Sequence, residues 1–232
     1  MQFVQFIRDA LSLLFPELCA GCSEALIHQE RQLCTHCIYN LPVTNFHLDS
    51  ENLAAKQLMG RVPISAAVSF LYFTSGSIVQ KIIHQIKYKN GFATAEFMGE
   101  LYGQRLQDLE EFKTCDLIIP VPLHKKRQRS RGYNQSAYFA RGLSKMFQVE
   151  TSDDNLIRIT HTESQTKSKN RYERFKNMRD LFKIKNPDLL KNKHILLVDD
   201  VLTTGATLEA CSATILEIPG VKVSIATLAF TK

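Results

Sequence analysis

The chain has 232 residues, of which 44% are hydrophobic and 22% are charged. These values exclude a disordered protein and a fibrous repeat, and a chain of this length buries about 70% of its unfolded surface without disulfide bonds. The 29 Lys and Arg residues outnumber the 23 Asp and Glu residues, and the resulting net charge of +6 favours an anionic ligand or partner.

Residues 1–15 are predicted to form a helix that ends before Pro16. Its apolar residues share one side at helical spacing: Phe3, Phe6, Ile7, Ala10, Leu11 and Leu14. We expect this narrow stripe to pack against the cysteine-rich segment that follows it. The alternatives are a membrane surface or a partner protein.

The sequence contains no transmembrane or secretory signal that we can identify. No uncharged apolar run approaches the roughly 18 residues that a membrane-spanning helix needs. The first 15 residues lack a leading basic cluster and carry Arg8 and Asp9, which is untypical of a secretory signal. We therefore expect a cytoplasmic protein without a transmembrane segment, with the inner face of the membrane as a second location.

Four of the six cysteines form two Cys-x2-Cys pairs, at Cys19, Cys22, Cys34 and Cys37. Disulfides are disfavoured in a reducing compartment, and four thiolates from two short knuckles suit a tetrahedral structural zinc. A redox-active cysteine pair is the alternative. The pattern predicts an N-terminal helix and zinc module over residues 1–45, followed by a polar linker over residues 46–64.

Residues 65–232 are predicted to form an α/β domain with a mostly parallel sheet flanked by helices, because apolar strand-like runs alternate with amphipathic helical segments. The predicted strands cover residues 66–73, 117–121, 156–159, 195–198 and 221–230. The predicted helices run from residue 78 to about 88 and over residues 92–108, 134–147 and 206–218.

Two segments between these elements carry much of the positive charge. Residues 125–131 hold five Lys and Arg residues and no acid, and we expect a loop there that binds an anion. Residues 161–177 are polar and basic with little apolar periodicity, which indicates a functional loop. The alternatives are a solvated charge run for the first segment and an ordinary mobile surface loop for the second.

The most informative segment runs from Ile195 to Thr207, where a buried strand leads into two acids, a Thr/Gly turn and a helix. The turn and the helix N-terminus offer unpaired N–H groups to a phosphate, and the carboxylates of Asp199 and Asp200 can accept hydrogen bonds from a vicinal diol such as that of ribose. The carboxyl ends of parallel strands are also where open α/β sheets bind ligands. The alternative is a capping threonine beside two solvated acids.

These residues carry a family resemblance. The segment Val198–Thr207 resembles the phosphoribosyl-diphosphate loop of type I phosphoribosyltransferases. Together with the four cysteines, three further motifs resemble the ComF family, whose members are associated with natural competence. These motifs are Pro120-Val121-Pro122-Leu123, Arg131-Gly132-Tyr133-Asn134-Gln135, and Ser164-Gln165-Thr166 followed by Arg174 and Asn177.

The resemblance implies a site for phosphoribosyl diphosphate and Mg²⁺. It implies that Asp199 and Asp200 hold the ribose in catalysis. The turn would hold the 5-phosphate through Val201, Leu202, Thr203, Thr204, Gly205, Ala206 and Thr207. The segment 122–132 corresponds to the pyrophosphate loop, and 161–177 to a mobile loop that closes over the site. Cationic ligands would be Lys125, Arg127, Arg129, Arg131 and Arg174, and Lys87 and Lys89 are further cations that could face the pocket.

The sequence is compatible with two functions. The first is a phosphoribosyltransferase whose acceptor the sequence does not identify. The second is a catalytically silent factor in DNA uptake that binds single-stranded DNA, since basic residues interleaved with Tyr133, Tyr172 and Phe175 offer backbone contacts and stacking platforms. Other competence proteins are further candidate partners.

Overall fold

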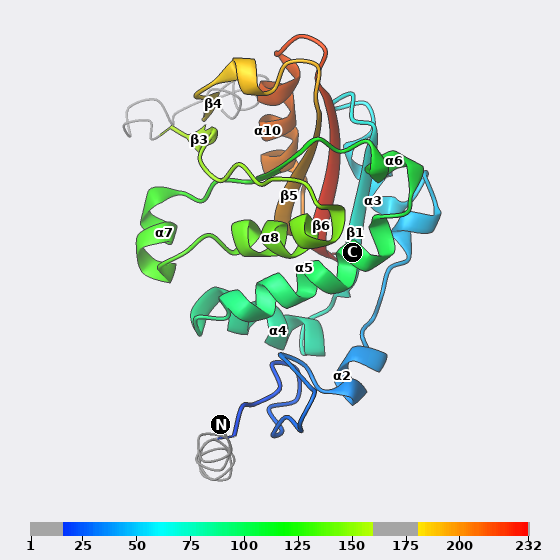
Figure 1. Cartoon of the computed structure of the whole chain (residues 1–232), viewed down its shortest axis with the longest axis vertical. Coiled ribbons are helices and arrows are strands. Elements are labelled where there is room, and N and C mark those ends of the chain that lie inside the picture. The colour runs from blue at the N-terminus through cyan, green and yellow to red at the C-terminus, as the bar shows by residue number, and fades with distance from the viewer. Residues whose placement is uncertain (1–15, 160–180, 232) are drawn as a thin grey trace.

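The protein is described by a computed structural model that covers residues 16–159 and 181–231. The predicted helix over residues 1–15 and the predicted loop over 161–177, which includes Arg174, lie outside the described residues. Figure 1 shows the elements in space. In chain order they are α2 (Thr35–Tyr39), η1 (Phe46–Leu48), α3 (Leu53–Leu58), β1 (Ala66–Phe73), α4 (Ile78–Tyr88), α5 (Phe92–Leu106), α6 (Glu110–Lys113), β2 (Leu117–Pro120), α7 (Lys125–Arg131), α8 (Gln135–Phe147), β3 (Leu156–Arg158), β4 (Phe182–Ile184), η3 (Pro187–Leu189), β5 (His194–Leu202), α10 (Ala206–Leu216) and β6 (Lys222–Thr231).

A sheet of four parallel strands in the order β1-β6-β5-β2 forms the centre of the described structure (Figure 1). Leu197 of β5 pairs with Ile225 of β6 on one side and with Ile119 of β2 on the other. All three residues are fully buried, as expected for parallel strands that helices cover on both faces. The predicted α/β architecture with a parallel sheet is confirmed.

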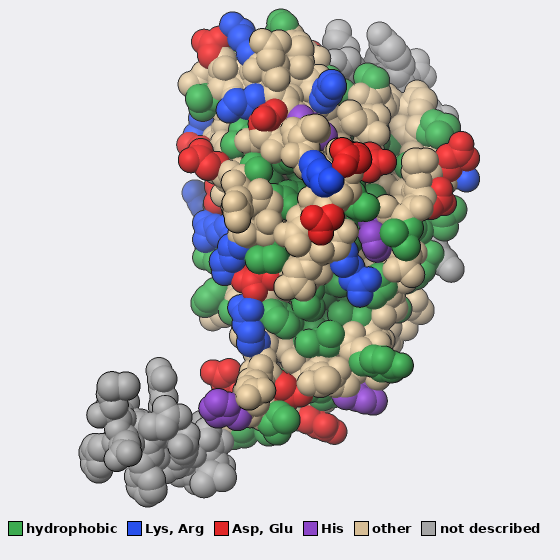
Figure 2. Space-filling model, turned by 45° about the vertical axis from the view of Figure 1, so that its right-hand side comes forward, with side chains coloured by type: hydrophobic (Ala, Val, Ile, Leu, Met, Phe, Trp, Pro, Cys, Tyr) green, Lys and Arg blue, Asp and Glu red, His purple; other side chains and the backbone are tan. Residues whose placement is uncertain are grey.

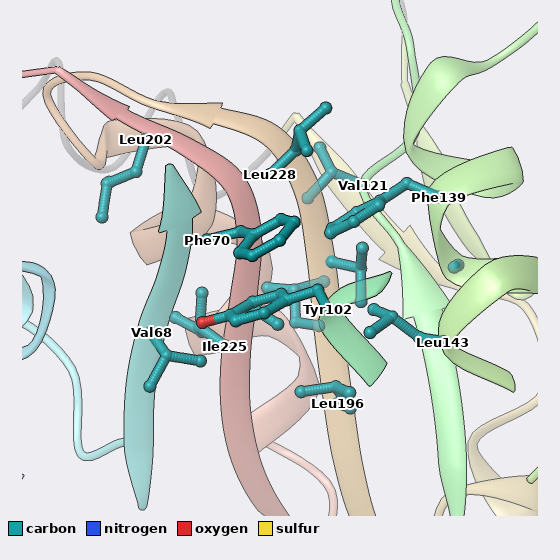
Figure 3. Packing of buried hydrophobic residues seen from close by; sticks show 14 of the residues in the cluster. Val68, Phe70, Tyr102, Val121, Phe139, Leu143, Leu196, Leu202, Ile225 and Leu228 are labelled. Carbon is teal, nitrogen blue, oxygen red and sulfur yellow. The ribbon is translucent and has the colours of Figure 1, made fainter. Parts of the chain in front are cut away.

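Helices cover both faces of this sheet. Helices α4, α5 and α8 pack on one face and α10 on the other, while α3 lies along β1 (Figure 1). Tyr102 of α5 stacks on Phe70 of β1 with ring centroids 4.7 Å apart (Figure 3). Helices α5 and α8 cross closely because Gly142 lacks a side chain, and a Cβ atom there would lie 2.0 Å from the carbonyl oxygen of Glu96.

The segment predicted as a polar linker, residues 46–64, is structured. It contains η1 and α3, and Phe46 and Leu58 are buried in the main core. Asn52 begins α3 by accepting hydrogen bonds from the N–H groups of Ala54 and Ala55. The six residues of α3 span fewer than two turns, which is too short for helical periodicity to show in the sequence. The division of the chain at residues 45 and 64 stays a prediction.

The expectation of a basic loop over residues 125–131 was wrong, because these residues form helix α7. Lys, Arg and Gln are good helix formers, and the helix has a cap at each end. His124 accepts a hydrogen bond from the N–H of Lys126, and Gly132 ends the helix in the left-handed conformation at φ +78°. The positive charges are therefore carried on an ordered element.

Two strands differ from their predicted form. Strand β5 continues past Val198 to Leu202, so both acids of the doublet belong to the strand. Strand β3 pairs with β4 in a separate antiparallel ribbon, and β4 was not predicted from the sequence. Beside this ribbon, the N–H of Ile159 donates to the carbonyl oxygen of Leu181.

Surface charge is mixed over much of the molecule. In Figure 2, which brings the right-hand side of Figure 1 forward, acidic and basic side chains are interspersed on the upper part of the face. Helix α7, at the left in Figure 1, has six exposed residues and one half-buried residue, none of them acidic. In the part of the chain that is described, no helix has both the length and the apolar character required to cross a bilayer.

Candidate phosphate and diol site

The turn between β5 and α10 presents free backbone N–H groups. The N–H groups of residues 204–208 make no hydrogen bond to any described residue. They lie at the positive end of an 11-residue helix, where an anion is stabilised. Asp199 and residues 201–208 line a small open pocket there. The pocket has the donors that a phosphate ester requires.

The carbonyl side of the same turn is held by the segment that contains α3. Gln57 donates to the carbonyl oxygen of Thr203, and Arg61 donates to that of Thr204 at 2.9 Å. Gly205 adopts φ +77°, and a Cβ atom there would lie 2.9 Å from Cδ2 of the buried Leu58. These contacts use the acceptors of the turn and leave its donors free. Sequence reasoning missed them because it treated residues 46–64 as a linker.

Asp199 is held at the end of β5 by hydrogen bonds. Its Oδ1 accepts from the hydroxyl of Ser136 on α8 at 2.9 Å and from the N–H of Asp200 at 2.8 Å. Burial raises the pKa of Asp199 to about 7, and the neighbouring charge of Asp200 acts in the same direction. The hydrogen bonds and the cation Lys87 oppose this shift without cancelling it. The carboxyl group therefore changes its charge near neutral pH.

Asp200 forms an ion pair with α4. Its Oδ2 lies 2.9 Å from Nζ of Lys87, and the two side chains are 19% and 21% exposed. The suggestion that Lys87 faces the pocket is thus consistent with the structure, whereas Lys89 is exposed and lies beside His84 and Gln85 on another surface. Both acids of the doublet have protein partners and do not point freely into solvent.

The predicted cationic ligands on α7 are placed differently from one another. Lys125, Arg127 and Arg129 are exposed. Arg131 is half-buried, faces the side-chain amide of Gln135 and lies 5.5 Å above the ring of Tyr88. Helix α7 follows β2 in the chain, at the same carboxyl-terminal edge of the sheet as the acid doublet. The structure brings Arg131 close to the end of α4 that carries Lys87.

Arg158 is a cation that the sequence patterns did not single out. It ends β3, its guanidinium lies 5.5 Å above the ring of Phe182, and its Nε is buried without a hydrogen-bond partner among the described residues. Burial lowers its pKa, and the nearby charge of Arg127 acts in the same direction. The sequence did not identify Arg158 as a site residue, because a single arginine after two apolar residues forms no motif. Its nearness to Arg127 of α7 follows only from the fold.

Candidate metal site

The four sulfurs of the predicted zinc module come together. The Sγ atoms of Cys19, Cys22, Cys34 and Cys37 all lie within 4.8 Å of one another, and those of Cys22 and Cys34 are 3.8 Å apart. Four thiolates about 2.3 Å from a tetrahedral zinc would be separated by about 3.8 Å, so the cluster has the size that the metal requires. No disulfide is present among these residues.

Backbone N–H groups also favour a thiolate in this cluster. The Sγ of Cys19 accepts from the N–H groups of Gly21 at 3.4 Å and Cys34 at 3.3 Å. Burial raises the pKa of Cys19, but the backbone hydrogen bonds outweigh burial and lower it to about 7. The knuckle is tight, because a Cβ atom on Gly21 would lie 3.0 Å from the Sγ of Cys37.

The cysteine cluster is docked on the α/β domain. Arg31, between the two cysteine pairs, lies 2.5 Å from Oε2 of Glu100 on α5 and 5.0 Å above the ring of Phe97. Glu100 is 8% exposed and also pairs with Lys145 of α8 at 2.7 Å. These two cations outweigh the effect of burial and lower the pKa of Glu100. The module is thereby linked to two helices of the domain.

Similarity to known proteins

Comparison with known proteins agrees with this geometry. The pattern of the family described as "Phosphoribosyl transferase domain" matches residues 134–232, which include both acids and the turn. The "DNA utilization protein YhgH" of Escherichia coli is 28% identical over 205 residues, which cover 86% of this chain and 84% of that protein. "Competence protein F" of Haemophilus influenzae is 32% identical over 136 residues, or 56% of this chain and 58% of that protein.

Two further similarities are shorter or more distant. "Competence protein ComFC" of Bacillus subtilis is 36% identical over 101 residues, which cover 44% of this chain and 38% of that protein. The solved adenine phosphoribosyltransferase of Leishmania tarentolae is 13% identical with a TM-score of 0.39, and the alignment covers 78% of this chain and 89% of that one. By the family pattern, the matched relatives and the four-cysteine cluster, the chain is similar to the proteins of the ComF/YhgH group and carries a segment of the phosphoribosyltransferase domain type.

Proposed function

We propose that the protein binds phosphoribosyl diphosphate with Mg²⁺ and transfers the phosphoribosyl group to an acceptor during DNA uptake. The observation that carries this proposal is the position of the paired acids Asp199 and Asp200 directly before a turn with free N–H groups. The carboxylates suit a ribose diol, and the N–H groups suit the 5-phosphate of the same sugar. The printed names of the relatives supply the link to DNA use and competence.

In this proposal each part of the ligand meets a different element. The 5-phosphate lies at the N–H groups of residues 204–208, with hydroxyl donors from Thr203, Thr204 and Thr207. The two ribose hydroxyls donate to Asp199 and Asp200. The diphosphate extends towards Arg131 and the other cations of α7, for which paired N–H donors of arginine are well suited.

The transfer reaction requires charge stabilisation at the ribosyl carbon and at the leaving diphosphate. The bond between C1 of the ribose and the diphosphate oxygen breaks with its electrons on the diphosphate, while a nucleophile of the acceptor bonds to C1. The acid doublet stabilises the ribosyl centre as it becomes positive, and the cations stabilise the leaving diphosphate. When bound, Mg²⁺ neutralises charge on the diphosphate.

The residues at the site fit a magnesium ion that arrives with its ligand. Mg²⁺ is usually held by one or two carboxylates together with substrate phosphates and water. Asp199 lines the pocket, and Asp200 follows it directly in β5, so two carboxylates are close to the turn. In this proposal the diphosphate supplies the remaining oxygen ligands of the ion.

Titration calorimetry with phosphoribosyl diphosphate and Mg²⁺ tests the proposal. We expect saturable binding by the wild-type protein and loss of binding when Asp199→Asn and Asp200→Asn are combined. The control is Asp154→Asn, whose side chain is 83% exposed, and which should bind as the wild type does. No binding by the wild type, or unchanged binding by the double variant, would remove the transferase proposal.

The second candidate function is binding of single-stranded DNA without catalysis. Exposed cations on α7 lie next to an aromatic cluster in which the rings of Tyr133 and Tyr138 are 5.3 Å apart and Arg141 lies 4.4 Å above Tyr138. Such a surface suits backbone charge and base stacking. Affinity for an oligonucleotide should then fall steeply as salt is raised. Affinity that does not depend on salt would argue against this function.

We further propose that the four cysteines hold one structural Zn²⁺, since their sulfurs have tetrahedral spacing and N–H donors. We propose the cytoplasm as the location, with the inner face of the membrane as a second site. Other competence proteins are the partners that the names of the relatives suggest.

A further inference from the structure

The end of helix α4 contributes a charge to the acid doublet. Nζ of Lys87 lies 2.9 Å from Oδ2 of Asp200, and about four fifths of each side chain is shielded from solvent. Helix α4 precedes residues 134–232, where the family pattern matches, so this cation reaches the site from outside the matched domain segment. The ion pair occupies one of the two carboxylates that we assign to the ribose diol.

Two contacts fix this end of α4 against the segment that follows α7. The hydroxyl of Tyr133 donates to the carbonyl oxygen of Ile86, and the guanidinium of Arg131 lies 5.5 Å above the ring of Tyr88. These contacts involve the residues on either side of Lys87. The backbone that carries Lys87 is therefore held close to Arg131 and Tyr133, while the ammonium group of Lys87 pairs with Asp200 at the end of β5.

Ligand binding must change the environment of this ion pair. A ribose hydroxyl that donates to Asp200 competes with the ammonium for the carboxylate, and a neutral hydroxyl gives the ammonium no anionic partner in return. The 2-hydroxyl and the substituent on C1 are on neighbouring carbons, so a diphosphate on C1 comes close to the same ammonium. Binding is weakened when a cation that is shielded from solvent loses its anionic partner. A ligand with a diphosphate avoids this loss, because the diphosphate replaces the carboxylate as the partner.

We propose that Lys87 selects a sugar that carries a diphosphate on C1 over one that carries only a 5-phosphate. Its ammonium group exchanges Asp200 for the diphosphate when the ligand binds. This inference rests on the proposed binding of phosphoribosyl diphosphate and adds a residue that determines ligand specificity.

The test compares two ligands on matched variants. Phosphoribosyl diphosphate and ribose 5-phosphate, each with Mg²⁺, are titrated calorimetrically into the wild type, Lys87→Met and Lys89→Met. Lys89→Met removes the same charge from an exposed position two residues away and should leave both affinities unchanged. Lys87→Met should weaken binding of the diphosphate about tenfold or more, and leave binding of ribose 5-phosphate within about threefold of the wild type.

Each other outcome is decisive as well. Equal losses for both ligands would show that Lys87 only supports Asp200, and no loss would show that it does not meet the diphosphate; either result overturns the inference while the proposed function stands. If the wild type binds neither ligand, the proposed function itself fails. Should Lys87→Met not fold, Lys87→Gln keeps a polar side chain without the charge and has the same expected result.

Discussion

At the scale of single residues, Asp199 shows a conflict between function and stability. Its carboxyl group is held among buried groups and beside a second acid, and its pKa is raised to about 7. In the unfolded chain the same group has a pKa of about 3.9. The folded state therefore holds a proton that the unfolded state has lost between about pH 4 and pH 7. Stability should fall as the pH rises through this range.

Replacement of this carboxyl group should remove the conflict. We compare the free energy of unfolding of Asp199→Asn with that of the wild type. The difference should shift in favour of the variant by roughly 3 kcal/mol between pH 4 and pH 8. Urea denaturation of the variant and the wild type at both pH values measures this effect. Asp154→Asn, at an exposed position, should not change the pH dependence in this way. A constant difference between wild type and Asp199→Asn would contradict a buried, protonated Asp199.

Gly205 allows a second prediction at this scale. Gly205→Ala places a Cβ atom in a left-handed conformation and 2.9 Å from Leu58, whereas Gly76→Ala has the same φ of +77° and nothing within 4 Å. Gly76→Ala should cost about 1–2 kcal/mol from conformation alone. Gly205→Ala should cost more, because the buried Leu58 has to move, and it alone should weaken binding of phosphoribosyl diphosphate. If urea denaturation gives the same loss in free energy of unfolding for both variants, Leu58 moves without an energetic cost, and the prediction is wrong.

The sequence identified the acid doublet and the turn because their neighbours in the chain form one motif. It did not connect Asp199 with Ser136, 63 residues away, or confirm Lys87 as a partner of Asp200. Those pairs depend on how α8 and α4 cross the sheet edge. Helix crossing is set by packing, such as the close approach at Gly142, and packing cannot be read from local patterns.

At the scale of elements, the cysteine module and α5 support each other through charge. Glu100 is buried and is neutralised by Arg31 from the module and Lys145 from α8. When a buried carboxylate loses one of its two cationic partners, the folded structure around it is destabilised. Unfolding of the cysteine module should therefore destabilise α5 around Glu100, while the sheet and α10 remain folded.

Cys34→Ala tests this coupling. We expect loss of the bound zinc, about one ion per chain in the wild type, and faster amide hydrogen exchange in residues 17–41 and around Glu100. The control is Cys115→Ala, which removes a buried thiol outside the cluster and should keep the metal. Full metal content in Cys34→Ala, measured by elemental analysis, would exclude this cluster as the zinc site.

The longer helices, such as α4 and α5, were predicted correctly, whereas the short helices α3 and α7 were not. Helix α3 is too short for a period, and α7 lacks apolar residues altogether, so neither has a hydrophobic pattern. Both are ordered by caps and by contacts with the turn or with α8. The contacts of Gln57 and Arg61 with the turn, which sequence reasoning missed, come from α3 and the residues that follow it.

At the scale of the whole molecule, the proposed ligand site combines segments from most of the chain. Strand β5 and α10 supply the acids and the turn, the segment with α3 holds the turn, α4 supplies Lys87, and α7 supplies further cations. Only part of this set lies within residues 134–232. The remaining contacts explain why the site needs residues that precede the matched domain segment.

The most direct test of the proposed site is a crystal structure of the protein with phosphoribosyl diphosphate and Mg²⁺. We predict the 5-phosphate at the N–H groups of residues 204–208, the ribose hydroxyls on Asp199 and Asp200, and the diphosphate between Lys87 and Arg131. A sugar bound elsewhere, with the acid doublet still paired to Ser136 and Lys87 and the turn without an anion, would contradict the proposed function.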